Sequence, residues 1–268
     1  MLKASLLILT GWCLSLAVNA AAFDHGDWNQ LLRQHVVSQR DGLTTAVDYQ
    51  AMNGDRNRLK KYLQSLEKVN LSEFELWSKP DQLAFLINAY NAWTIELVLT
   101  GYPKIQSIKE LGSFFRSPWK KTFIPLLGKI RSLDDIEHGM IREAGRYNDP
   151  RIHFAVNCAS IGCPALRTEA YSGERLELQL QEQTERFLSD RTRNRYIDNQ
   201  LEVSSLFKWY REDFERGWQG FHSLKAFFAN FATQLGLTDA DIQRLRAGEI
   251  GIEILDYDWQ LNAIPEQL

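Results

Sequence analysis

The stretch "SKPDQLAFLINAYNAWTIELVLTGYP", residues 78–103, decides the fold, because it predicts one long helix in the middle of the core. Ser78 can cap this helix, and Asp81 completes a Ser-x-x-Asp capping box. Gly101 is a typical end signal. From residue 83 to 99 apolar side chains occur on nearly every side, which is the pattern of a helix that is buried all round.

Two asparagines interrupt this apolar pattern. Asn88 and Asn91 are three residues apart and therefore lie on one face of the helix. A buried amide without partners costs about 1 to 3 kcal/mol, so both side chains must be hydrogen-bonded. Two interpretations remain open: a polar network that fixes the helix against the segment at His153, which is favoured, or direct contact with a ligand.

The remaining patterns predict more helix than strand. Amphipathic or capped helices are expected after Trp28 and at residues 56–69, 132–145, 173–190 and 223–236. Strands are expected within residues 44–52, around Gly128, at 151–158 and within 249–262. The predicted class is therefore α+β: a predominantly helical single domain, residues 23–268, with a small antiparallel or mixed sheet.

The first residues have the pattern of a secretory signal peptide. Lys3 precedes an apolar run from Leu6 to Val18, and small residues follow, which places cleavage after Ala20 or Ala22. The run is shorter than the about 20 apolar residues that a membrane span needs. We expect a periplasmic or secreted protein without a membrane span.

The charge of the chain argues against a polyanion-binding protein. The formal net charge is −3, and loss of residues 1–22 would remove one lysine and no acidic residue. An acidic balance of this kind excludes nucleic acid as the expected partner. With 44% hydrophobic residues, 8 Trp and 14 Phe, the chain can bury a large core.

The segment "HFAVNCASIGCPAL", residues 153–166, raises the question of chemistry. Cys158 becomes a nucleophile if a neighbouring cation or imidazole lowers its pKa. In an exported protein, Cys158 and Cys163 can instead form a structural disulfide across the intervening turn, which is favoured. A metal site is disfavoured, because the spacing matches no paired Cys-x-x-Cys pattern, and unpaired packing cysteines remain a further alternative.

The histidine that could activate Cys158 is chosen by spacing. On an extended strand His153 would lie about 16 Å from Cys158 and on the opposite face. His138 is therefore the better candidate base, and it shares a helix face with Arg142, four residues later. Lys208 and Asp213 are five apart and share no helix face, so no simple ion pair is predicted between them.

Blocks along nearly all of the mature chain resemble the family called domain of unknown function 547. They are "QLAFLINAYNAWTIELVLTGYP", "SIKEL", "SLDDIEHGMIR", "DPRIHFAVNCASIGCPAL", "FKWYREDF" and "YDWQLN". The resemblance implies that the family's marked positions are Asn88, Asn91, Glu137, His138, His153, Cys158, Cys163, Pro164, Lys208, Trp209 and Asp213. Because the family also includes intracellular proteins, the resemblance weakens a purely disulfide interpretation of the cysteines.

Three functional hypotheses follow, and none of them needs a cofactor or a metal. The leading one is a cysteine-dependent hydrolase or acyl transferase for a peptide or amide, distantly similar to papain or transglutaminase, with catalytic residues Cys158, His138, Asn88 and Asn91. Papain-like enzymes carry the cysteine at a helix start, whereas here it is predicted to follow a strand. The other is a non-catalytic binding module for a small molecule or peptide with a structural disulfide, and a scaffold without a small-molecule site is a third possibility. The expected binding residues are Glu137, His153, Asn157, Cys163, Lys208 and Asp213.

Overall fold

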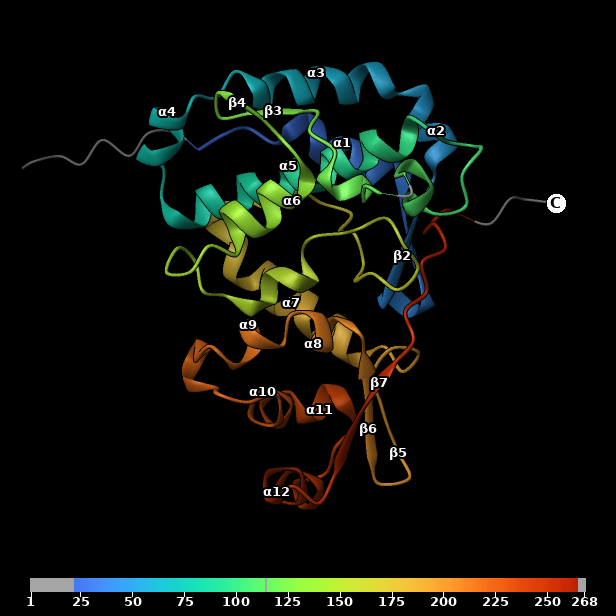
Figure 1. Ribbon diagram of the computed structural model, residues 1–268, viewed down its shortest axis with the longest axis vertical. Coiled ribbons are helices and arrows are strands. Elements are labelled where there is room, and N and C mark those ends of the chain that lie inside the picture. Colours follow the sequence, from blue (N-terminus) through green and yellow to red (C-terminus); the bar gives the residue numbers. More distant parts are fainter. Residues whose placement is uncertain (1–21, 114, 265–268) are drawn as a thin grey trace, which may run out of the picture.

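The computed structural model describes residues 22–113 and 115–264 (Figure 1). The predicted signal peptide, residues 1–22, lies outside the described residues except for Ala22. In the part that is described, no helix combines the length and the apolar character that crossing a membrane requires.

Helices make up most of the described chain, and the predicted α+β class is confirmed. The α-helices are α1 (Gly26–His35), α2 (Tyr49–Gly54), α3 (Arg56–Glu67), α4 (Leu71–Leu76), α5 (Lys79–Leu99), α6 (Leu133–Ile136), α7 (Leu176–Ser189), α8 (Leu206–Trp209), α9 (Arg211–Glu215), α10 (Leu224–Asn230), α11 (Ala232–Leu235) and α12 (Asp239–Ala247). Short helical turns join them: η1 (Arg40–Gly42), η2 (Ile108–Leu111), η3 (Pro118–Lys120), η4 (Glu137–Ile141), η5 (Pro150–Phe154), η6 (Gly173–Arg175) and η7 (Trp218–Gly220).

The strands form three small sheets. They are β1 (Val36–Gln39), β2 (Thr44–Val47), β3 (Ile124–Leu126), β4 (Lys129–Arg131), β5 (Arg195–Ile197), β6 (Gln200–Ser204) and β7 (Gly251–Leu255). β1 pairs with β2 and β3 with β4, both antiparallel, and the turn at Gly128 joins the second pair as predicted. In the third sheet β6 pairs antiparallel with β5 and parallel with β7, so this sheet is mixed.

Helix α5 is the centre of the upper half of the molecule (Figure 1). The Ser78 side chain accepts a hydrogen bond from the Asp81 backbone N–H, which confirms the predicted cap. Nearly every residue from Gln82 to Leu99 is buried, because α3, α6, η4 and α7 all pack against the helix. The sequence expectation of a helix that is apolar all round is confirmed.

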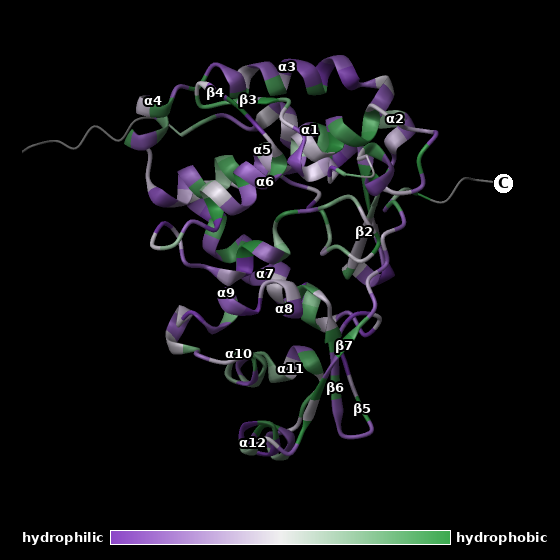
Figure 2. Cartoon of the chain, in the orientation of Figure 1, coloured by the Kyte–Doolittle hydropathy of each residue, from purple (hydrophilic) through white to green (hydrophobic). Residues whose placement is uncertain are grey.

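The core consists of two apolar clusters that α7 connects. The first surrounds α5, and the second is rich in phenylalanine and includes β6, α8, α9 and α10. Leu176 and Leu180 of α7 belong to the first cluster, whereas Phe187 and Leu188 belong to the second. Surface helices alternate polar and apolar residues, as Figure 2 shows for α3. The prediction that residues 23–268 form a single domain stays a prediction.

The strand predicted at residues 151–158 is wrong. Residues 150–154 form a 3-10 helix, and the Asp149 side chain begins it by accepting a hydrogen bond from the Arg151 backbone N–H. Residues 151–157 are all buried, so the alternation of apolar and polar residues did not separate an inner from an outer face. The chain then turns through residues 155–165, which we call the cysteine loop.

The C-terminal segment, residues 256–264, returns from β7 to the upper half of the molecule (Figure 1, red). On the way it follows the cysteine loop, because the backbone N–H groups of Ile161 and Gly162 donate to the carbonyls of Gln260 and Asp258, both at 2.8 Å. It ends beside β2, where Val47 donates to Asn262 at 2.8 Å. Residues that are far apart in the sequence therefore meet at the cysteine loop.

Asn88 and Asn91 both hold backbone segments against α5. The Asn88 amide donates to the Tyr171 carbonyl at 2.8 Å and accepts from the Tyr171 N–H at 3.0 Å. The Asn91 amide donates to the Ala155 carbonyl at 3.0 Å and accepts from the Asn157 N–H at 2.8 Å. These contacts fit the polar-network interpretation of the pair.

We expect Asn91→Ala to lower the free energy of unfolding by about 2 to 4 kcal/mol, because it leaves a buried N–H and a buried carbonyl without a partner. Thr94→Val is the matched control on the same buried helix. The Thr94 hydroxyl donates only to the Tyr90 carbonyl one turn earlier, so its loss should cost less than about 1 kcal/mol. Urea unfolding measures both values. If both variants lost the same free energy of unfolding, the role of Asn91 in holding the cysteine loop against α5 would be contradicted.

Candidate functional site

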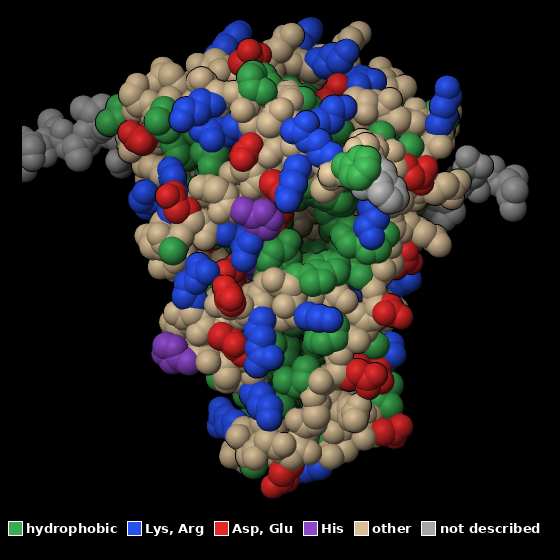
Figure 3. Space-filling view, viewed as in Figure 1, with side chains coloured by type: hydrophobic (Ala, Val, Ile, Leu, Met, Phe, Trp, Pro, Cys, Tyr) green, Lys and Arg blue, Asp and Glu red, His purple; other side chains and the backbone are tan. Residues whose placement is uncertain are grey.

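A cavity of about 640 Å³, including its open mouth, lies where α5, η3, η4, η5, the cysteine loop, α8 and the C-terminal segment meet. On the face drawn in Figure 3, hydrophobic side chains surround a hollow near the middle of the molecule. This cavity is the candidate site.

Aromatic rings form much of the wall. The aromatic residues of the wall are Tyr90, Trp119, Trp209, Tyr210, Tyr257 and Trp259. Trp209, Tyr257 and Trp259 form a cluster whose ring centroids are 4.6 to 5.7 Å apart. Trp119 joins this cluster through Trp259, at 5.7 Å. Trp209 is 45% exposed, so its side chain is accessible to a ligand that enters the cavity.

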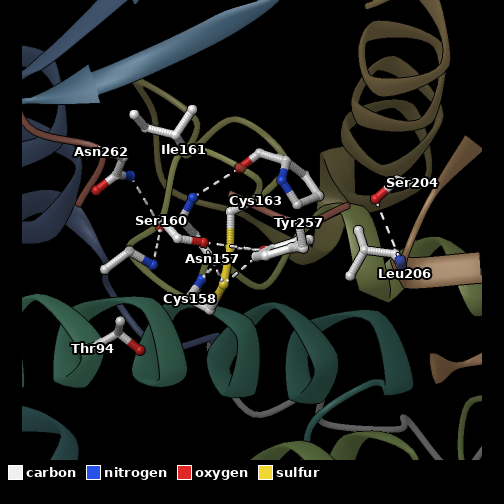
Figure 4. The surroundings of a disulfide bond; sticks show 12 residues. Thr94, Asn157, Cys158, Ser160, Ile161, Cys163, Ser204, Leu206, Tyr257 and Asn262 are labelled. Atoms are coloured by element: carbon white, nitrogen blue, oxygen red, sulfur yellow. Dashed lines mark hydrogen bonds between the residues drawn. A yellow bond between two sulfur atoms is a disulfide. The ribbon is translucent and has the colours of Figure 1, made fainter. Parts of the chain in front are cut away.

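The two cysteines contribute another part of the wall as a Cys158–Cys163 disulfide (Figure 4). The Tyr257 hydroxyl lies 3.1 Å from Cys158 Sγ and 3.2 Å from Cys163 Sγ. The Cys158 backbone N–H donates to Cys163 Sγ at 2.8 Å, and Ser160 Oγ lies 3.2 Å from Cys158 Sγ. Hydrogen-bonding groups thus hold both sulfur atoms in place.

His153 and Asp213 form a buried pair beside the cavity. His153 Nε2 lies 2.7 Å from Asp213 Oδ2, and the imidazole stacks on Tyr210 at a centroid distance of 3.8 Å. Burial lowers the pKa of His153 more than the hydrogen bond to Asp213 raises it. His153 Nδ1 is buried and has no hydrogen-bond partner among the described residues. Asp213 therefore orients the imidazole through Nε2, and Nδ1 is left without a partner among the described residues.

Two arginines keep Asp213 ionised. Arg142 Nε lies 2.6 Å from Asp213 Oδ2, and Arg216 Nη2 lies 2.9 Å from Oδ1. Burial by itself raises the pKa of Asp213, but the hydrogen bonds from His153 and Arg142 reverse this and hold the pKa below its usual range. Asp213 is thus a carboxylate shared by one imidazole and two guanidinium groups.

Glu137 provides a buried carboxyl group in the cavity wall and is 4% exposed. It begins η4, a π-helical turn that continues α6, and π-helical turns are frequent at functional sites. Tyr90 and Tyr210 have raised pKa values, first because they are buried and then because Glu137 lies beside both phenols. Within the described residues no lysine, arginine or histidine forms an ion pair with Glu137.

His138 lies at the edge of the same cavity, with 43% of its side chain exposed. Its Nδ1 is 2.6 Å from Arg142 Nη1, so the two residues share a helix face as predicted. Its Nε2 is 3.9 Å from Asp134 Oδ1. His138 is therefore more exposed than His153 and is not oriented by a close carboxylate.

The cavity brings together five of the predicted site residues: Glu137, His138, His153, Cys158 and Cys163. Asp213 stands behind this wall and holds His153. The other predicted residues do not line the cavity. Asn88 and Asn91 bind backbone groups, Asn157 closes the cysteine loop by donating to the Pro164 carbonyl at 2.8 Å, and Lys208 is exposed on α8.

The prediction that His153 lies far from Cys158 assumed a strand at residues 151–158. Because that strand is wrong, this prediction is wrong as well. A 3-10 helix followed by a turn is far shorter than an extended strand, so both residues line one cavity. Sequence reasoning also missed Tyr90, Trp119, Tyr210, Tyr257 and Trp259. The last two lie in the family-like block "YDWQLN", which was their only signal in the sequence.

The described residues contain no group of three or more His, Cys, Asp or Glu side chains arranged to hold a metal ion. The polar groups of the cavity instead come as one imidazole–carboxylate pair and one separate carboxyl group. Such an arrangement can orient a polar organic ligand or move a proton.

We expect Asp213→Asn to lower the free energy of unfolding at pH 7 by about 1 to 3 kcal/mol, because His153 and two arginines lose their carboxylate. The folded-state pKa of Asp213 is depressed, so its contribution is present above the unfolded value of about 4 and disappears as the pH falls. The difference between wild type and variant should therefore shrink below about pH 4. Urea unfolding from pH 7 to pH 3 measures it, with the exposed neighbour Glu212→Gln as the control. A difference that does not change with pH would contradict the ionised role of Asp213.

Comparison with known proteins adds the family and no activity. Residues 74–188 match the family model described as "Protein of unknown function, DUF547". The matched span contains α5, η4 and the whole cysteine loop, but neither Asp213 nor the C-terminal segment. No curated protein and no solved structure matches the chain. Residues 74–188 of the chain therefore belong to the family described as Protein of unknown function, DUF547.

Proposed function

We propose that the chain is a binding protein for a small organic molecule, which occupies the cavity beside the Cys158–Cys163 disulfide. The observation that carries the proposal is the convergence of aromatic rings, a buried carboxyl group and an oriented imidazole on one hollow. Buried polar groups cost stability unless they are satisfied, so a fold without a ligand gains little from placing them there. Small-molecule sites have this composition: mostly apolar walls with a few polar groups.

The disulfide supports binding over thiol catalysis. A sulfur atom in a disulfide has no thiolate form and cannot attack an acyl carbon. The hydrogen bonds from the Tyr257 hydroxyl and the Cys158 N–H fix the pair as part of the wall. In this proposal the cysteines shape the cavity and do not react.

A cysteine-dependent hydrolase or acyl transferase is the second candidate, and the His153–Asp213 pair favours it. The reaction first needs a dithiol reductant, which reduces the disulfide to two thiols and is itself oxidised to a disulfide. Cys158 Sγ would then attack the acyl carbon of an amide while His153 Nδ1 accepts the thiol proton. The C–N bond breaks, the amine leaves with that proton, and water or an acceptor amine then cleaves the thioester and releases Cys158. His153 replaces His138 as the base in this candidate, because Asp213 orients it at 2.7 Å.

The binding proposal predicts that some small molecules bind in the cavity and that Trp209→Ala weakens them at least tenfold. Trp209 is partly exposed in the wall, so its loss removes ligand contact and little core packing. A library of neutral, cationic and anionic fragments is tested by ligand-observed NMR on the mature protein. Trp218→Ala, which removes a tryptophan outside the cavity, is the control, and circular dichroism checks both variants. Absence of any fragment that Trp209→Ala weakens would refute the binding function.

The redox state of the cysteines decides between the two candidates. We expect protein isolated from the periplasm to yield a linked Cys158–Cys163 peptide in mass spectrometry, with no labelling of either residue by iodoacetamide before reduction. If Cys158 is instead free and labels rapidly, with an apparent pKa well below about 8.5, the thiol enzyme becomes the leading candidate.

A further inference from the structure

We propose that the cavity selects an organic cation, with an ammonium or methylated ammonium group seated between Glu137 and the aromatic wall. This inference rests on the proposed binding function and names the chemical class of its ligand. It is carried by the charge of the wall, by the position of Glu137 and by the aromatic rings around it.

The ionisable residues of the wall favour a positive ligand. Asp134 and Glu137 are the acidic residues of the wall, and no lysine or arginine of the described chain lines the cavity with them. The two histidines are the only basic residues in the wall, and burial lowers the pKa of His153, which keeps it neutral near pH 7. The wall of the cavity therefore carries more negative than positive charge.

Glu137 is the most important acidic residue of the wall for this argument. Its carboxyl group is buried, lies beside the phenols of Tyr90 and Tyr210, and forms no ion pair with a described residue. Its Oε1 has no hydrogen-bond donor in good geometry there, and the phenols of Tyr90 and Tyr210, which lie close enough to hydrogen-bond the carboxyl group, bring no positive charge. A buried carboxylate is usually paired with a cation, since isolation from water is unfavourable for it. A ligand cation would supply the missing partner.

The aromatic wall favours the same class of ligand. Cations are attracted to the faces of Trp and Tyr rings, and quaternary ammonium ligands are recognised in this way. Two rings of the wall already contact cations of the protein: Lys109 Nζ lies 3.7 Å from the Trp259 ring, and the Arg142 guanidinium lies 4.8 Å from Tyr210. Among the described residues no lysine or arginine lies over the ring of Trp119, Trp209 or Tyr257, so these three rings of the wall are available to a ligand cation.

Positive side chains near the mouth oppose a cation only weakly. Lys120 is exposed and acts on Asp134, and His138 is close to the same carboxylate. The charges of Arg142 and Arg193 reach Tyr210 and Tyr257, but each guanidinium is paired with a carboxylate, Asp213 and Asp190 respectively. Exposed charges are screened over about 8 Å at physiological ionic strength, whereas Glu137 in the cavity is screened much less. The local attraction inside the cavity therefore outweighs the repulsion at the mouth.

Choline and its neutral isostere 3,3-dimethylbutan-1-ol test the inference, because they share a shape and differ in charge. NMR titration of the mature wild-type protein should show choline binding at about millimolar affinity or tighter, and at least tenfold more tightly than the isostere. The anion 3,3-dimethylbutanoate should bind more weakly still. Trp209→Ala should weaken choline, which locates it in the cavity.

Glu137→Gln then tests the charge itself. Choline affinity should fall at least fivefold, while that of the neutral isostere stays unchanged, and Glu143→Gln, which removes an exposed carboxylate, should affect neither. If the isostere or the anion binds as tightly as choline, or choline does not bind, the cation inference is overturned. The fragment library still decides separately whether the cavity binds a ligand at all. If Glu137→Gln does not fold, the comparison of choline with the isostere on wild-type protein remains decisive.

Discussion

Amide side chains that hold the cysteine loop are the constraint on which the cavity depends. The loop has little regular structure, yet most of it is buried, so its backbone groups need partners that no helix or sheet supplies. Asn91 of α5 binds the loop at its beginning, through Ala155 and Asn157. Gln183 of α7 donates to the Phe154 carbonyl at 3.0 Å and to the Ala165 carbonyl at 2.7 Å, so it holds both ends.

This constraint explains why polar residues occur in apolar helices. An apolar residue in place of Asn91 or Gln183 would improve the burial of its helix and leave the loop unsatisfied. The loop held in this way places the disulfide against Tyr257, which belongs to the C-terminal segment. The cavity thus depends on hydrogen bonds that side-chain amides make to buried backbone groups. The residues that line the cavity are different from the residues that make these hydrogen bonds.

Local signals in the sequence were sufficient for most helices. The capping box of Ser132 and Asp135 forms with both reciprocal hydrogen bonds, and the spacing of His138 and Arg142 correctly placed them in contact. Such signals act within one or two helical turns, where geometry follows from spacing. The family resemblance, rather than spacing, identified Glu137, which lies beside His138 on η4 at the cavity.

Sequence patterns gave wrong or missing predictions in two situations: where a segment is buried on all sides, and where two contacting residues are distant in the sequence. Alternation at residues 151–158 suggested a strand, but a segment without a solvent face carries no information in its alternation, and the Asp149–Pro150 start favoured a helical turn. Tyr257 reaches the disulfide from almost a hundred residues away, so no spacing rule could join them. The choice of His138 over His153 was a direct consequence of the first failure.

The electrostatics of the cavity also bear on the chemistry of its sulfur atoms. Burial raises the pKa of Tyr257 most strongly, the Ser160 hydrogen bond and the charge of Arg193 lower it, and the charge of Glu137 raises it again. The Tyr257 hydroxyl lies 3.1 Å from Cys158 Sγ, and burial of this kind disfavours an anionic sulfur. A nucleophilic cysteine needs the opposite environment, with a cation or imidazolium to stabilise the thiolate. The burial of the wall therefore favours an uncharged form of the two cysteines, and the disulfide is such a form.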